Sequence, residues 1–251
     1  MTAPFALRVR STEIAVNMPA RDPLLAEVAD RLRRGVGFAL ATINLDHLVK
    51  LRADPRFAEA YLDQDFVVAD GNPVVWLSRL ARRPVALVAG SDLVRPLAAC
   101  AAEENASVAL FGSTEETLAA AADALAREFP GLKIAIKIAP SQGFDPTGAE
   151  ASDMLRRLGD SGASLTMIAL GAPKQEIFAA FGRKELPSMG FVSVGAGLDF
   201  IGGGQRRAPQ WMRRIAIEWL WRVAQNPRRL TVRYLKCIAI LPGLAFNAIR
   251  S

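Results

Sequence analysis

The sequence predicts an α/β protein built on a mostly parallel sheet with helices on both faces. Short runs rich in Val, Ile and Phe recur along the chain, and helix-length stretches of mixed polar and apolar residues separate most of them. A helix between two strands returns the chain to the same end of the sheet, so this alternation favours parallel strands. The chain has 251 residues, of which 51% are hydrophobic and 22% charged, enough for one sizeable core.

Six strands are expected, at 36–43, 66–69, 107–111, 132–139, 164–170 and 190–194. Helices are expected at 22–34, 46–64, 72–81, 92–104, 114–129, 147–158 and 173–185. Two of these helices have recognisable starts, because Ser113 to Glu116 form a capping-box pattern and Pro173 suits a first turn. The glycine-rich stretch 195–204 is expected to be a flexible hinge in preference to a phosphate cradle.

The C-terminal segment 205–251 differs from the rest of the chain in charge. It holds ten lysines and arginines and one acid, a charge of +9, whereas residues 1–204 carry −3. Apolar residues fall on one side of a helix here, opposite arginines: Trp211, Met212, Ile215, Trp219, Leu220 and Val223. We interpret 1–204 as a catalytic domain and 205–251 as a basic amphipathic helical appendage that contacts an anionic membrane surface.

Two alternatives bear on this appendage. It could pack on its own domain. It could also pack on a sister subunit, and the protein would then be a homo-oligomer.

The last apolar run, 237–246, contains Pro242 and is expected to be too short to span a bilayer. Nucleic acid is not an expected partner, because no platform of alternating basic and aromatic residues appears in the sheet region.

Several classes of protein fit the sequence poorly. Cys100 and Cys237 have no CxxC spacing, and the N-terminus lacks the features of a signal peptide, so we expect a cytoplasmic protein with reduced thiols. No GxGxxG or P-loop motif follows the first strand, which argues against a nucleotide-dependent oxidoreductase. We expect neither a cofactor nor a metal, since His47 has no ligand cluster and the Asp63–Asp65 DxD is interpreted as two solvated acids.

Polar residues follow several predicted strands, where ligands bind in open parallel sheets. These candidates are Thr42, Asn44, Asp70, Gly71, Gly112, Gly171, Lys174, Gln175 and Glu176. Asp70 is placed either to accept a proton from a substrate hydroxyl or to cap the next helix. A solvated helical turn would explain Glu176 better than Lys174, because the helix dipole disfavours cations there, so a role in the cleft is preferred.

Three stretches resemble the WecG/TagA/CpsF family of bacterial glycosyltransferases. They are TINLDHLVKL…VVADGNPVVW (42–76), IALGAPKQE (168–176) and DFIGGGQRRAPQWMRRIAIEWLWRVAQNPRRLTVRY (199–234), with GSDL (90–93) and LFGSTEET (110–117) between them. The resemblance covers roughly 36–235. It implies a Rossmann-like, inverting, metal-independent transferase that moves a sugar from a UDP-sugar to a polyprenyl-diphosphate-linked saccharide acceptor. Such enzymes act at the cytoplasmic face of the membrane in building cell-surface polysaccharide.

The resemblance also implies residue roles. Asp70 matches the family's general base and Thr42 its assisting polar residue, while Lys174, Gln175 and Glu176 match its sugar-nucleotide motif. Tail arginines are expected near the diphosphate: Arg207, Arg222, Arg229 and Arg233. The chain departs from the family at Leu87, where many relatives have an arginine, so either a tail arginine supplies that charge or donor handling differs.

Two function classes stay open at this point. The first is the transferase, with N-acetylmannosamine, its uronic acid, glucose or glucuronic acid as the transferred sugar. The second is a non-catalytic, membrane-associated scaffold that binds nucleotide sugars without turning them over.

Overall fold

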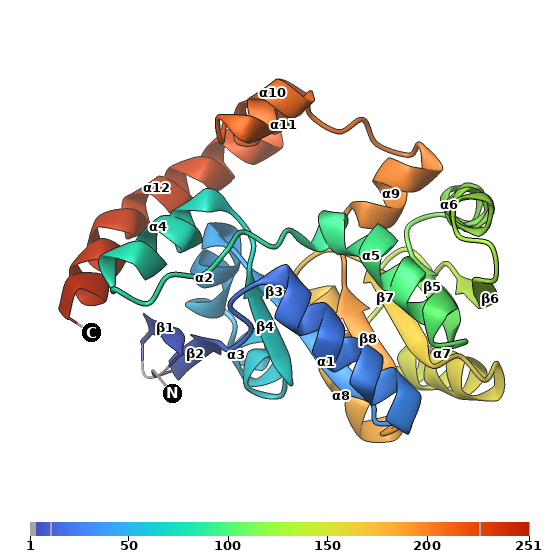
Figure 1. The fold of residues 1–251 in the computed structure, drawn as a ribbon. Helices are drawn as coiled ribbons and strands as arrows, with labels where there is room; N and C mark the ends of the chain where they lie inside the picture. Colours follow the sequence, from blue (N-terminus) through green and yellow to red (C-terminus); the bar gives the residue numbers. More distant parts are fainter. Residues whose placement is uncertain (1–3, 11, 226, 251) are drawn as a thin grey trace.

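A six-stranded parallel sheet forms the centre of the protein, with the strand order β4-β3-β8-β7-β5-β6 (Figure 1). The computed structural model describes residues 4–10, 12–225 and 227–250. The sheet strands are β3 (Phe38–Ile43), β4 (Phe66–Ala69), β5 (Ser107–Gly112), β6 (Lys133–Ile138), β7 (Leu165–Ala169) and β8 (Gly190–Ser193). All six expected strands are confirmed. A separate antiparallel hairpin, β1 (Phe5–Val9) and β2 (Thr12–Val16), was not anticipated.

The helices of the first 204 residues follow the expected order. They are α1 (Arg21–Arg34), α2 (Leu45–Leu51), α3 (Pro55–Leu62), α4 (Asn72–Leu80), α5 (Gly90–Glu103), α6 (Glu115–Glu128), α7 (Ala149–Asp160), α8 (Lys174–Glu185) and α9 (Gly197–Gly202). The single helix expected over 46–64 is two helices. The second of these helices begins after its N-cap, Asp54. The Asp54 side chain accepts a hydrogen bond from the Phe57 amide, and Pro55 lies in the first turn.

Helices cover both faces of the sheet, as the sequence predicts. Successive residues of β3 point to opposite faces: Phe38 and Leu40 pack in the core formed with α1, α5 and α6, while Ile43 packs in the core formed with α2, α3 and the hairpin. A third cluster joins α7 and α8 to the sheet around Phe111 and Phe178, whose rings stack with centroids 4.4 Å apart. These cores hold the carboxyl ends of the strands in fixed relative positions.

The glycine-rich stretch 195–204 is not a flexible hinge, because it contains α9. Leu198 is fully buried, and Gly202 lies so close to α6 that an added Cβ would sit 2.3 Å from the Thr117 carbonyl oxygen. Close packing against α6 therefore orders a segment whose composition favours flexibility.

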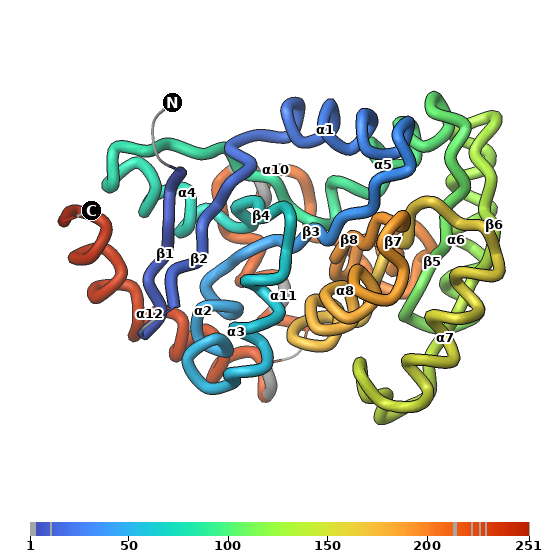
Figure 2. The backbone as a smooth tube through the Cα atoms, turned by 90° about the horizontal axis from the view of Figure 1, so that it is seen from below, coloured from blue at the N-terminus to red at the C-terminus, as the bar shows by residue number. Residues whose placement is uncertain are grey.

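The C-terminal segment forms three helices, α10 (Gln210–Arg214), α11 (Glu218–Gln225) and α12 (Pro227–Arg250). The apolar pattern that suggested one amphipathic helix is split between α10 and α11, because Ala216 adopts a left-handed conformation between them, with φ of 63°. Figures 1 and 2 show α12 running along one side of the molecule, where it contacts α2, α4 and β1.

Helix α12 continues through Pro242 and is longer than the sequence suggested. Leu244 and Ala248 are buried in the cluster that holds the hairpin, whereas Val232, Leu235 and Ile238 are more than half exposed. Its residues Leu230–Arg250 have the length and apolar composition to cross a bilayer, and only a small share of this stretch is buried in the protein. The expectation that the apolar run is too short to span a bilayer is therefore wrong, because the helix extends beyond that run.

Candidate active site

Thr42 and Asp70 lie side by side at the carboxyl ends of β3 and β4. The strands pair in parallel up to Ile43 and Ala69, and the Asp70 amide donates to the Ile43 carbonyl at 2.8 Å. The Thr42 hydroxyl then reaches the Asp70 carboxylate, with 3.4 Å between Oγ1 and Oδ2. Asp70 is partly buried and does not cap α4, whose N-cap is Gly71 without a side-chain hydrogen bond. The structure thus removes the helix-cap alternative for Asp70.

The N-terminus of α5 closes one side of this position. A Cβ added to Gly90 would lie 3.2 Å from Thr42 Cγ2 and 3.1 Å from the Ser193 carbonyl oxygen at the end of β8. A glycine lets the helix approach this closely, and the positive end of its dipole favours negative charge nearby. The sequence did not single out Gly90 as a site residue, because no strand directly precedes it. Its signal was the small-residue pair Gly90-Ser91 at the start of a predicted helix.

His47 fixes the backbone on which Thr42 sits. Its Nδ1 lies 2.8 Å from the Thr42 carbonyl oxygen, which also accepts a hydrogen bond from the Tyr61 hydroxyl at 2.6 Å. Burial lowers the pKa of His47 to about 4, so the ring is neutral at physiological pH. Asn44 caps α2 by accepting from the His47 amide, and its Nδ2 faces His47 Nε2 at 3.4 Å. Asn44 therefore helps to orient His47, which holds the Thr42 backbone in place.

Gln175 joins the loops that follow β7 and β8. Its Oε1 accepts hydrogen bonds from the amides of Gly171 and Gly195, each at 3.2 Å, and its Nε2 donates to Glu176 Oε1 at 2.7 Å. Gln175 is 3% exposed and Glu176 fully buried, so the solvated-turn alternative is wrong for both, while Lys174 is partly exposed. Gln175 fixes the relative position of two strand-end loops.

Glu176 has a buried carboxyl group that is only partly satisfied by hydrogen bonds. Its Oε2 has no hydrogen-bond partner among the described residues, and burial raises its pKa to about 7 although the Gln175 hydrogen bond acts in the opposite direction. Its backbone carbonyl accepts from Gln64 at 3.2 Å. Burial therefore favours the protonated, neutral form of this carboxyl.

Gly112 holds the ends of β5 and β7 together. It has a φ of 107°, and an added Cβ would lie 2.4 Å from the Ala169 carbonyl oxygen, which also accepts from the Ser113 amide at 3.0 Å. The Ser113 hydroxyl donates to the carboxylate of Asp199 on α9. Gly112 thus allows a close backbone contact at the carboxyl ends of β5 and β7.

Arg207 reaches the first turn of α5. Its guanidinium pairs with the Asp92 carboxylate at 2.5 Å and donates to the Ser91 hydroxyl at 3.3 Å. Its Nε is buried and has no hydrogen-bond partner among the described residues. A tail arginine therefore lies beside the helix N-terminus that closes the Thr42 side of the site.

Arg233 forms an ion pair with Asp46 of α2. The ion pair measures 2.7 Å from Nε to Oδ1, and the same carboxylate pairs with Lys50 at 2.8 Å. Burial alone would raise the pKa of Asp46, but the Lys50 hydrogen bond and the two cations lower it overall. Lys50 also donates to the Ala172 carbonyl at 2.8 Å, which connects α12 to the loop after β7. Sequence reasoning missed Asp46 and Lys50.

The side chains of Arg222 and Arg229 lie outside the described residues, so their expected positions near a diphosphate stay predictions.

The DxD acids have structural partners. Asp65 accepts from the Ala39 amide at 2.9 Å and pairs with Arg31 and Arg183 at 2.9 and 3.1 Å, so it is not a solvated acid. Asp63 pairs with Lys184 at 2.7 Å. In the described part of the chain, no group of three or more His, Cys, Asp or Glu side chains is arranged to hold a metal ion.

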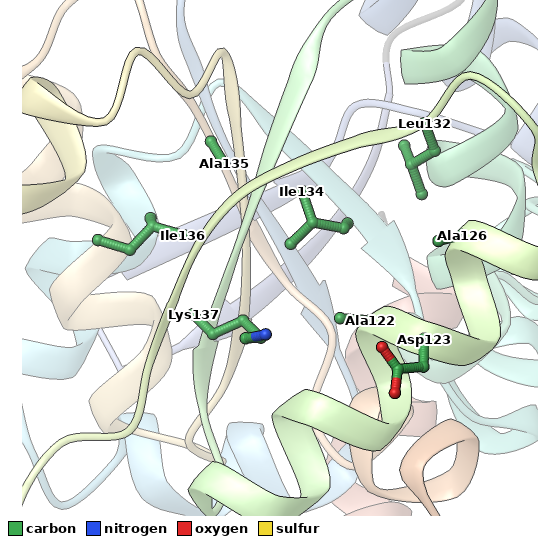
Figure 3. A pocket seen from close by; sticks show the side chains of 8 residues that line it. All are labelled: Ala122, Asp123, Ala126, Leu132, Ile134, Ala135, Ile136 and Lys137. Atoms are coloured by element: carbon green, nitrogen blue, oxygen red, sulfur yellow. The ribbon is translucent and has the colours of Figure 1, made fainter.

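A cavity of about 260 Å³ lies away from these residues (Figure 3). Residues of α6 and β6 line it, among them Asp123 and Lys137. Strands β6 and β4 form opposite edges of the sheet, so this cavity is separate from the Thr42–Asp70 site.

Known proteins identify the family. Residues 9–251 match the glycosyl transferase WecG/TagA/CpsF family. A Bacillus spizizenii protein named N-acetylglucosaminyldiphosphoundecaprenol N-acetyl-beta-D-mannosaminyltransferase is 29% identical over 199 residues, covering 79% of this chain and 75% of its own. A Bacillus subtilis protein of the same name is 26% identical over 224 residues, covering 87% and 85%. The chain belongs to the WecG/TagA/CpsF family and is a glycosyltransferase.

Proposed function

We propose that the protein transfers a sugar from a UDP-sugar to a saccharide linked to polyprenyl diphosphate. The two relatives are named for the transfer of N-acetylmannosamine to N-acetylglucosaminyldiphosphoundecaprenol, so this donor sugar and this acceptor are the first to test. The observation that carries the proposal is a carboxylate, Asp70, paired with Thr42 at converging strand ends in a member of this family.

In the proposed reaction, the acceptor hydroxyl attacks the anomeric carbon, the bond from that carbon to UDP breaks, and the configuration inverts. Asp70 takes the proton of the attacking hydroxyl, and general-base help of this kind contributes about 10²–10⁴-fold. The Thr42 hydroxyl orients the carboxylate, while His47 and Tyr61 hold the Thr42 backbone in place.

In this proposal, positive groups of the protein stabilise the negative charge of the departing UDP. No divalent metal takes part. The N-terminus of α5 and the guanidinium of Arg207, paired with Asp92 at its first turn, are suitably placed donors. Arg207 would then supply the cation that Leu87 does not. Arg222, Arg229 and Arg233 stay candidates for contacts with a diphosphate, and Arg233 would have to leave Asp46 to make one.

We further propose that the protein acts at the cytoplasmic face of the cell membrane, with residues 205–251 on the lipid. Exposed apolar residues support this: Trp211, Ile215, Trp219, Leu220, Val232, Leu235 and Ile238. The arginines of the same segment complement anionic headgroups.

The test is a transfer assay with the purified full chain, UDP-N-acetylmannosamine and N-acetylglucosaminyl-diphosphoundecaprenol, with and without EDTA. A lipid-linked disaccharide with inverted configuration is expected in both conditions. Formation of no product with any of a panel of UDP-sugars would contradict the proposal, and binding of UDP without turnover would point to the scaffold alternative.

A further inference from the structure

Helix α4 carries an exposed apolar face outside the C-terminal segment. In the described part of residues 1–204, the large apolar side chains exposed by more than a third are Leu62, Trp76, Leu80 and Leu87. Three of these four lie within twelve residues, on α4 and the loop that follows. Trp76 is 50% exposed and Leu80 47% exposed, one helical turn apart on the side of α4 opposite the buried Val74 and Ser78.

The same stretch is positively charged. Residues 71–90 contain Arg79, Arg82 and Arg83 and no acid. Arg79 and Arg82 are exposed, and Arg79 lies between Trp76 and Leu80 along the helix. An exposed tryptophan and leucine with arginines around them are the composition of a helix face that lies in a lipid interface.

Helix α4 lies next to the C-terminal segment. Helix α12 contacts α4, and Figure 1 shows the two helices side by side. Helix α12 exposes its own apolar residues Val232, Leu235 and Ile238. Helix α4 also begins two residues after Asp70, so a bilayer on this face would lie next to the proposed site.

We propose that α4 and its following loop form a second membrane-contact surface, which binds an anionic bilayer together with α12. Trp76, Leu80 and Leu87 enter the interface, and Arg79 and Arg82 contact lipid phosphates. This surface would hold the catalytic domain at a fixed orientation to the membrane, so that a lipid-linked acceptor reaches Asp70 along α4. The inference rests on the proposed membrane association of residues 205–251.

The experiment measures binding of the full-length chain to extruded vesicles of phosphatidylglycerol and phosphatidylcholine, by sedimentation. The double variant Trp76→Gln/Leu80→Gln should partition about tenfold more weakly than the wild type, because binding scales with buried apolar area. The matched control is Leu62→Gln, which removes a leucine of α3 that is 61% exposed and should bind as the wild type does.

A charge variant tests the same surface without removing apolar residues. Arg79→Glu should weaken binding to phosphatidylglycerol vesicles by about tenfold at low salt and much less at high salt. Arg156→Glu, which reverses an exposed arginine on α7, serves as its control and should have little effect.

The outcomes separate this inference from the function on which it rests. Wild-type binding by both α4 variants, with binding abolished by Leu235→Glu/Ile238→Glu in α12, would overturn the α4 surface and leave the tail as the membrane contact. Wild-type binding by all variants would overturn both assigned surfaces, and a lack of vesicle binding by the wild-type chain would contradict the proposed membrane association itself. A change in sedimentation coefficient of Trp76→Gln/Leu80→Gln with unchanged vesicle binding would show that α4 contacts a second copy of the chain, and would also overturn the inference.

Discussion

Arg233 of α12 and Asp46 of α2 form an ion pair that joins the C-terminal segment to residues 1–204, with 2.7 Å between Nε and Oδ1. Asp46 is 8% exposed, and Lys50 connects it onward to the Ala172 carbonyl in the loop after β7. Asp46 and Lys50 of α2 thus link Arg233 of α12 to Ala172, in the loop that Gln175 organises. The position of α12 is therefore linked through these contacts to the loop after β7, at the edge of the site.

Replacement of Asp46 by Asn is expected to lower the free energy of unfolding by about 2 kcal/mol, because two cations lose a buried partner. It should also increase protease cleavage within α12. Urea unfolding and timed proteolysis measure the two effects. Asp153→Asn removes the partner of an exposed arginine on α7 and should change neither; equal effects of the two substitutions would show that the Asp46 pair does not hold α12.

Replacement of Asp70 by Asn should lower kcat by about 10²–10⁴-fold, since an amide cannot accept the proton of the acceptor hydroxyl. Binding of UDP, measured by calorimetry, should change little, because the donor groups assigned to UDP lie on α5 and Arg207. The exposed Asp123 on α6 provides the control substitution to Asn. Turnover by Asp70→Asn at the wild-type rate would exclude Asp70 as the base.

The stability of the protein should depend on the protonation of Glu176. Its pKa rises from 4.5 to about 7 on folding, so the folded state holds a proton that the unfolded state has released, and stability falls as pH rises from about 4.5 to 7. Glu176→Gln should remove this loss and stabilise the protein by up to about 3 kcal/mol at pH 8, with little change at pH 4.5.

Denaturant unfolding of Glu176→Gln and the wild type across this pH range measures the difference. His47 acts in the opposite sense, because its pKa falls to about 4 on folding and its contribution to stability is lost as pH falls below 6.5. The comparison of the two chains cancels the His47 contribution. Parallel stability curves would mean that Glu176 ionises in the folded protein as it does in the unfolded chain.

Replacement of Gly112 by Ala should cost roughly 3 kcal/mol or more, because the new methyl group would overlap the Ala169 carbonyl oxygen and the backbone has a positive φ. Gly131 has a similar φ of 97° with open space around it, so Gly131→Ala should cost only the backbone strain, roughly 1–2 kcal/mol. Thermal unfolding of both variants measures the difference. Equal losses would show that β5 and β7 separate easily at this end.

The sequence by itself determined the layered α/β architecture and the edge of the sheet at which the polar candidates gather. Both follow from local patterns: apolar runs, helix starts such as Thr114, and polar residues such as Thr42 and Asp70 directly after strands. The three family-like motifs were also visible, because each is contiguous in the chain. The hairpin of β1 and β2 was missed, although its residues alternate between buried and exposed positions.

Only the tertiary structure decided which candidates meet and what each contacts. Asp70 lies against Thr42 and not at a helix cap, Gln175 binds two loop amides, and Asp65 is held by arginines from α1 and α8. These partners lie up to 118 positions apart. Strand order and helix packing bring them together, and those depend on the burial of the whole apolar surface, which no local window of sequence contains.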